Sequence, residues 1–177
     1  MIRRPALALI ALTMACWHSV LAQTPATDAS RPATSAALAI VGDVATPLTL
    51  SAVDLKAMPR TRVEQIDHEV KRVHEGVLVS AILERAGVPV GAGLRGEALT
   101  TVVVAHATDN YRVAFSLGEL DQGLARQDII VADTTDGAAL AEPQGPLRLV
   151  VPKDSRGARS VRMLVRLEVV RLATPPR

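Results

Sequence analysis

The sequence predicts a mixed α+β domain, in which the strands of mixed β-sheets dominate and two or three short helices accompany them. Short apolar runs bounded by turn-forming residues recur along the chain, as is typical of strands. Few segments have the apolar spacing of a helix. With 177 residues, 49% of them hydrophobic and 21% charged, the chain has the size and composition of one globular domain with an ordinary core.

The first 22 residues have the features of a cleaved signal peptide. They begin with Arg3 and Arg4, continue with an apolar run over residues 6–15 and end with the small or β-branched residues Val20 and Ala22. The apolar run is much shorter than the roughly 20 residues that span a bilayer, so we expect no transmembrane anchor after cleavage. The expected location is the periplasm or the medium. Lipid attachment at Cys16 is an alternative that the preceding residues match poorly.

Cysteine and aromatic residues are scarce. Cys16 is the only cysteine, so cleavage after Ala22 leaves a cysteine-free mature chain. We therefore expect no disulfide, no cysteine nucleophile, no zinc–cysteine site and no iron–sulfur cluster. Aromatic residues make up 2% of the chain, and the formal net charge of +2 comes from Arg3 and Arg4, which leaves the remainder balanced. Both properties argue against a nucleic-acid partner.

The chain after the leader divides into a spacer and a domain. Residues 23–36 consist mainly of Ala, Thr, Pro and Ser, a composition that cannot form a core, and are expected to be a flexible spacer. The folded domain is expected over residues 37–173. Its first elements are two short strands, over residues 38–42 and 47–50, and a helix that ends near Met58.

Several segments of the domain have recognisable boundaries. The first helix begins at Ser51, which has capping-box spacing to Asp54. Residues 77–86 place apolar side chains on one helical face, and Gly87 provides a C-terminal cap. A third short helix is expected over 117–124. Further strands are expected over residues 61–66, 101–105, 111–115, 128–132, 147–151 and 161–169, with turns at Asp109–Asn110 and Asp136–Gly137.

Three segments hold residues that can carry chemistry. The glycines of residues 91–96 have dinucleotide-motif spacing, but they follow a helix and precede a strand, so we interpret them as a plain loop. Residues 67–75 hold two histidines and three acids, which would suit a divalent metal if the segment folded back on itself. Their alternating charges favour a solvated edge. His106 ends an apolar strand and is interpreted as a packed or hydrogen-bonded side chain that can border a pocket.

The C-terminal part of the chain is strongly basic. Residues 145–177 carry eight Lys and Arg against two acids, a net charge of +6, while residues 23–144 carry −6. Within the basic part, Arg156, Arg159 and Arg162 lie in an expected loop, and guanidinium groups bind phosphate and carboxylate well. Two interpretations stay open: these arginines bind an anionic ligand, or they pair with the acidic part of the chain.

The order of the segments resembles the molybdopterin-binding domain of the sulfite oxidase family over about residues 37–171. The resemblance rests on short motifs that are common singly and more specific together. They are Gly42 with PLTL at 47–50 and DLKAMP at 54–59, HEGVLV at 74–79 with ILERAGV at 82–88, ATDNY at 107–111 with FSLGEL at 115–120, Asp136–Gly137, GPLRLVVP at 145–152, RGARSVR at 156–162 and RLEV at 166–169.

This resemblance implies a sulfite-oxidase-like α+β fold around a molybdenum–molybdopterin cofactor. The anionic phosphate end of such a cofactor is held by basic side chains and backbone amides. Carried over to this sequence, cofactor binding falls on Arg156, Gly157, Arg159, Ser160 and Arg162. The residues expected at the rim of the pocket are His68, His106, Asp109 and Tyr111. No metal ligand is assigned.

The sequence departs from the family pattern at one decisive position. Active members place a cysteine thiolate on the metal, and the cysteine expected after the strand near residues 63–66 is missing, where the chain reads Asp67-His68-Glu69. A different ligand would change the electronic properties of the metal. Three hypotheses follow: an exported family domain with lost or altered redox activity, an active molybdenum oxidoreductase with His68, Glu69 or solvent as ligand, and a cofactor-free periplasmic interaction or sensor scaffold with a protein partner.

Overall fold

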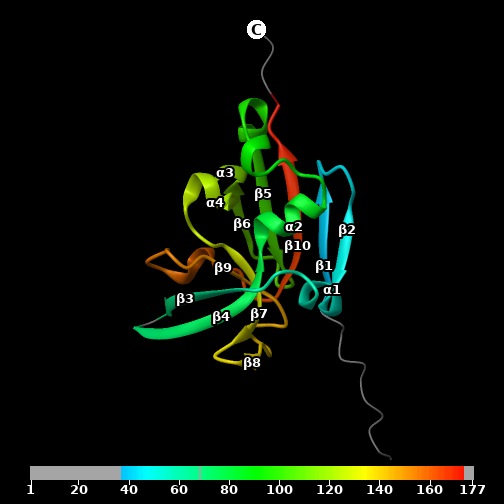
Figure 1. Ribbon diagram of the computed structural model, residues 1–177. Coiled ribbons are helices and arrows are strands. Elements are labelled where there is room, and N and C mark those ends of the chain that lie inside the picture. Colours follow the sequence, from blue (N-terminus) through cyan, green and yellow to red (C-terminus); the bar gives the residue numbers. More distant parts are fainter. Residues whose placement is uncertain (1–36, 68, 174–177) are drawn as a thin grey trace, which may run out of the picture. The chain divides into compact units, whose positions relative to one another are not determined.

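The computed structural model describes residues 37–67 and 69–173. These residues lie in one compact unit. The predicted leader and spacer lie outside the described residues. In the described part of the chain, two five-stranded sheets and four short α-helices surround the main apolar cluster, so the mixed α+β prediction is confirmed (Figure 1).

The first sheet, sheet A, has the strand order β2-β1-β10-β5-β6. Strands β1 and β10 run parallel and the other neighbours run antiparallel. Alternate residues of these strands face the core, as the period of a half-buried strand requires. The strands are β1 (Ala37–Gly42), β2 (Leu48–Ser51), β5 (Thr101–Ala107), β6 (Arg112–Ser116) and β10 (Leu164–Arg171).

The second sheet, sheet B, has the order β3-β4-β7-β8, and β9 also pairs with β7. Strands β3 and β4 form a long hairpin at the edge of this sheet (Figure 1). Inner residues of β3, β7 and β9 form a second, smaller apolar cluster. The strands are β3 (Thr61–Asp67), β4 (Val70–Leu78), β7 (Ile130–Thr135), β8 (Ala138–Ala139) and β9 (Arg148–Val150).

The helices are short, and three of the four α-helices in the described part of the chain begin at a Ser or Asp cap. Helix α1 (Ala52–Lys56) has the predicted capping box, in which Ser51 and Asp54 exchange hydrogen bonds. Helix α2 (Val79–Arg85) buries its apolar face in the main core and ends before Gly87, whose φ of +78° suits a glycine cap. The remaining elements are α3 (Leu117–Leu120), α4 (Gln122–Ala125) and the 3₁₀ turns η1 (Gly91–Gly93), η2 (Gly96–Thr100) and η3 (Gly157–Arg159).

Three local predictions need correction. Residues 70–78 form strand β4 between β3 and β7, so the helix expected from residue 77 begins at Val79. Residues 69–73, within the segment interpreted as a solvated edge, are exposed in agreement with that interpretation. The helix expected over 117–124 is interrupted at Asp121, whose backbone is extended and whose side chain caps α4. The last strand begins at Leu164 instead of residue 161. A register shift just after Leu164 leaves Val165 exposed, against the expected alternation.

Sheet B is tied to the segment before β3 by a part-buried ion pair. Arg60 donates two hydrogen bonds to the carboxylate of Asp133 on β7, at 3.0 and 2.5 Å, and Thr134 donates a third at 2.8 Å. Burial raises the pKa of Asp133, but the hydrogen bonds from Arg60 and Thr134 outweigh it, so the pKa lies below its ordinary value of 3.8. The charged carboxylate therefore stabilises the folded state.

This lowered pKa predicts acid sensitivity. The unfolded state takes up the proton first, so the contribution of Asp133 is present above about pH 4 and is lost as the pH falls through the folded-state pKa. We expect the free energy of unfolding, measured in urea at pH 6 and pH 3, to fall less on acidification in Asp133→Asn than in the wild type. Glu97→Gln, an exposed change, serves as control and should follow the wild type. Equal acid sensitivity in Asp133→Asn would contradict the assignment.

Candidate functional site

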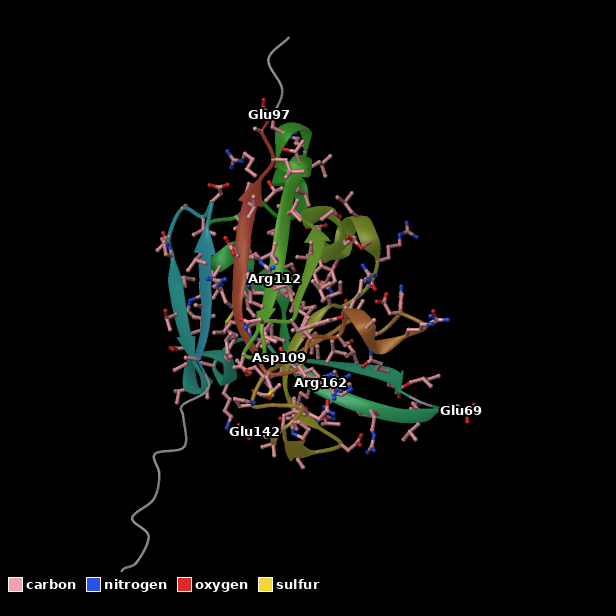
Figure 2. All side chains as sticks on the ribbon, turned by 180° about the vertical axis from the view of Figure 1, so that it is seen from behind. Glu69, Glu97, Asp109, Arg112, Glu142 and Arg162 are labelled. Carbon is pink, nitrogen blue, oxygen red and sulfur yellow. The ribbon has the colours of Figure 1, made fainter. Side chains whose placement is uncertain are left out.

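A cavity of about 860 Å³ lies where the tip of the β3–β4 hairpin, the β5–β6 turn and the segments on both sides of β9 meet. This volume is within the usual range for small-molecule sites. Figure 2 shows Asp109 and Arg162 at the centre of the view and Glu69 at the end of the hairpin. The lining residues are Ile66, Glu69, Asp109, Tyr111, Gln144, Arg148, Ser155, Arg156, Gly157, Ala158, Ser160 and Arg162.

Two exposed arginines give the wall of this cavity its positive charge. Arg156 and Arg162 flank the η3 turn, and neither forms an ion pair within the described part of the chain. Gly157 and Ala158, between them in sequence, line the cavity as well. The wall therefore offers guanidinium groups beside a tight backbone turn, which suits an anion.

A third arginine belongs to a buried polar network beside the cavity. Arg148 on β9 is 6% exposed and donates to Gln144 Oε1 at 3.1 Å and to Gln65 Oε1 at 3.4 Å. Gln65 in turn donates to Ser160 Oγ at 2.9 Å and to Val151 O at 3.0 Å. Each of these side chains is restricted by its neighbours, so Arg148 is held in a defined orientation.

Arg159 has a different environment, although it lies in the same run as Arg156 and Arg162. Its Nε and Nη2 donate to both carboxylate oxygens of Asp154, at 2.8 and 2.7 Å, and its Nη1 donates to Glu119 Oε1 at 2.7 Å. Burial raises the pKa of Glu119, but the hydrogen bonds from Arg159 and Ser116 lower it by more than burial raises it. The pKa of Glu119 therefore lies below its ordinary value. Arg159 is not among the residues that line the cavity.

The β5–β6 turn is attached to the arginine-bearing loop. Tyr111 donates its hydroxyl to the carbonyl of Ala158 at 2.6 Å, and the backbone N–H of Thr108 donates to Met163 O at 3.1 Å. Asp109 accepts from the backbone N–H of Tyr111 at 3.0 Å. These contacts bring two segments that are about fifty residues apart in the sequence into one wall.

The structure brings together most of the predicted site residues. Of the residues predicted to hold a cofactor, Arg156, Gly157, Ser160 and Arg162 line the cavity, as do the predicted rim residues Asp109 and Tyr111. His106 does not: its Nε2 lies 2.8 Å from Glu168 Oε2, and Arg166 lies 3.0 Å from its Nδ1, on neighbouring strands of sheet A. His68 lies outside the described residues.

The metal interpretation of residues 67–75 finds no support in the described part of the chain. His74 is 1% exposed on β4, and its Nδ1 lies 2.8 Å from Thr135 Oγ1. Glu75 accepts hydrogen bonds from Arg60 and Arg62. Over residues 37–67 and 69–173, no three His, Cys, Asp or Glu side chains are grouped so that they could hold a metal ion.

Sequence reasoning missed the buried network. Gln65, Gln144 and Arg148 were not singled out, although one arginine inside the apolar run of residues 147–151 is an unusual signal. Of the two open interpretations of the basic C-terminal part, pairing with acids holds for Arg159. Arg156 and Arg162 form no ion pair within the described residues and line the cavity, and binding of an anion by them stays a prediction. Three arginines against Glu69 and Asp109 make the lining net positive, so it suits an anionic small molecule.

Comparisons with known proteins concern the family and the fold of the chain. The model of the oxidoreductase molybdopterin binding domain family matches residues 23–175. A search of curated proteins found no match. Among solved structures, the chain is similar to the sulfane dehydrogenase SoxCD from Paracoccus pantotrophus, with a TM-score of 0.60 and 23% identity over 75% of this chain. At that identity the likeness concerns the fold, and it spans 37% of the chain of that protein.

No helix within residues 37–67 or 69–173 is long and apolar enough to cross a membrane.

Proposed function

Since the chain belongs to the oxidoreductase molybdopterin-binding domain family, we propose that it is an exported member whose cavity binds a phosphate-bearing, molybdopterin-type ligand and whose redox activity is lost or altered. One observation carries the proposal. Arg156 and Arg162 lie in the cavity wall without an acidic partner among the described residues, while Arg159 between them is fully engaged with acids.

The donors of the cavity fit the anionic end of such a ligand. Arg156 and Arg162 supply charged N–H groups for phosphate oxygens, and Arg148 adds a buried positive charge. Gly157 has no side chain that would separate a phosphate from the backbone of the η3 turn. Tyr111 offers a phenol ring against which a planar heterocycle can pack.

The metal end of the ligand has no comparable set of residues. When molybdenum is bound by such a ligand, it supplies oxygen-atom transfer or two-electron redox chemistry. The only cysteine of the chain is Cys16, in the predicted leader, and the described residues offer no cluster of metal-binding side chains. We therefore assign the residues of the cavity to binding and orientation alone. The lack of a thiolate is the reason why we propose lost or altered activity.

Export is proposed from the leader. Arg3, Arg4 and the apolar run of residues 6–15 support cleavage after Ala22 and a periplasmic or secreted location. A periplasmic protein partner belongs to the alternative proposal of a cofactor-free scaffold, which the cysteine-free mature chain motivates.

The proposal is tested by the ligand content of the purified protein. The full chain is produced in a host that makes the cofactor, and pterin is measured by fluorescence after oxidative release, with molybdenum measured by mass spectrometry. We expect near-stoichiometric pterin. Intact mass tests export, since cleavage leaves a chain that begins at Gln23. A folded protein without pterin, beside a cysteine-containing relative that is loaded in parallel, would contradict the proposal and favour a cofactor-free scaffold.

A further inference from the structure

Arg159 is the most completely engaged arginine of the loop. All of its hydrogen bonds go to Asp154 and Glu119, neither of which lines the large cavity. Its guanidinium carbon also lies 5.4 Å from the ring centroid of Phe115, a core residue that is 1% exposed. Arg159 is therefore fixed on three sides by protein groups.

These contacts determine the shape of the loop. Asp154 and Arg159 lie on either side of Arg156 in the sequence, so their two-fold hydrogen bond closes a short loop that contains Arg156 and Gly157. The contact with Glu119 attaches this closed loop to α3. Glu119 is itself fixed, because it accepts from the backbone N–H of Ser116 at 2.9 Å and from its hydroxyl at 3.1 Å in a capping box.

We propose that Arg159 is a positioning residue, which holds the 154–160 loop on α3 so that Arg156 and Arg162 face the cavity, and that it does not contact the ligand. This inference rests on the proposed function, because it concerns how the same cavity binds its anionic ligand. It assigns to Glu119 and Asp154, which are acids outside the cavity lining, a supporting role in binding an anion. If charge repulsion alone mattered, these two acids would weaken the binding of an anion.

Whether Glu119→Gln weakens or strengthens ligand binding distinguishes a positioning role of Arg159 from direct contact with the ligand. Glutamine preserves the capping box but loses the charged contact with Arg159. If Arg159 positions the loop, the affinity for the probe 6-hydroxymethylpterin phosphate should fall about 3- to 10-fold, because the loop is held less firmly. If Arg159 instead contacts the ligand, removal of a competing negative charge should strengthen binding. Calorimetric titration of the full chain, below the unfolding temperature, measures this affinity.

A second measurement needs no ligand. Amide hydrogen exchange of residues 154–160 should be faster in Glu119→Gln and in Arg159→Lys than in the wild type, and unchanged in Arg156→Gln. Glu97→Gln removes a distant exposed charge and is the matched control for both measurements. Equal or tighter probe binding in Glu119→Gln, or unchanged exchange in the loop, would overturn the positioning role. If the wild type fails to bind the probe, the proposed function fails, and the exchange rates alone decide the role of Arg159.

Discussion

Replacing both Arg156 and Arg162 with glutamine is expected to weaken binding of 6-hydroxymethylpterin phosphate about 100-fold. Both side chains line the cavity and lack an ionic partner among the described residues, so they are free to hydrogen-bond a phosphate. A hydrogen bond to a charged group contributes about 1.5 kcal/mol or more, and about 1.4 kcal/mol corresponds to a factor of ten in affinity. Calorimetric titration of the full chain at constant ionic strength measures the change.

Two controls restrict the interpretation of this loss. The unphosphorylated 6-hydroxymethylpterin should bind the wild type and the double variant with similar affinity, because the two arginines act on the phosphate. Replacing Arg95 and Arg112 with glutamine changes the net charge equally at exposed positions outside the cavity, and should alter the affinity less than about 3-fold. A double variant of Arg156 and Arg162 that binds the phosphate ester as the wild type does would show that the ligand is held elsewhere.

Gly76→Ala is expected to produce a large loss of stability. Gly76 lies on β4 beside a register shift in the pairing with β7. An added Cβ would lie 2.0 Å from Val131 O and 2.6 Å from Ala132 Cα, which are backbone atoms that cannot rotate away. Relief requires separation of β4 from β7, so we expect a loss of about 4 kcal/mol or more in the free energy of unfolding. The corresponding fall in Tm is about 10 °C or more.

Gly93→Ala is the matched control for this substitution. An added Cβ at Gly93 would meet only Pro89 Cβ, at 3.8 Å, which is an ordinary contact distance. Its Tm should lie within about 2 °C of the wild-type value. Thermal unfolding followed by circular dichroism compares the two variants under identical conditions. A Gly76→Ala protein as stable as the Gly93→Ala protein would mean that β4 and β7 are not packed as closely as described.

The fold was largely predictable because local patterns carry it. The capping box of Ser51 and Asp54, the glycine cap at Gly87 and the alternating burial of β5 follow from sequence spacing alone. Strand β4 was not predictable in this way, since its first half is exposed and charged. It is a strand because β3 and β7 pair with it on both sides. The pairing with β7 joins segments that are far apart in the sequence, so local patterns do not reveal it.

The candidate site was predictable in part. The sequence predicted Arg156, Gly157 and Arg162, because basic residues around a glycine suit an anion whatever surrounds them, and Ser160 followed from the family resemblance. The sequence alone could not separate Arg159 from its neighbours, since this depends on how far Asp154 and Glu119 lie from it in space. Gln65 and Arg148 were missed for the same reason: their contact joins β3 and β9, which are far apart in the chain.

By itself, the sequence determined the α+β class, the family, the absence of any cysteine after Cys16 and the basic character of the C-terminal part. Each of these depends on residue identity and local order, which are present before folding. The tertiary structure alone decided which arginines face the cavity and which are neutralised by acids. That distinction depends on distances between segments, and the strength of an ionic contact falls steeply with distance and exposure to water.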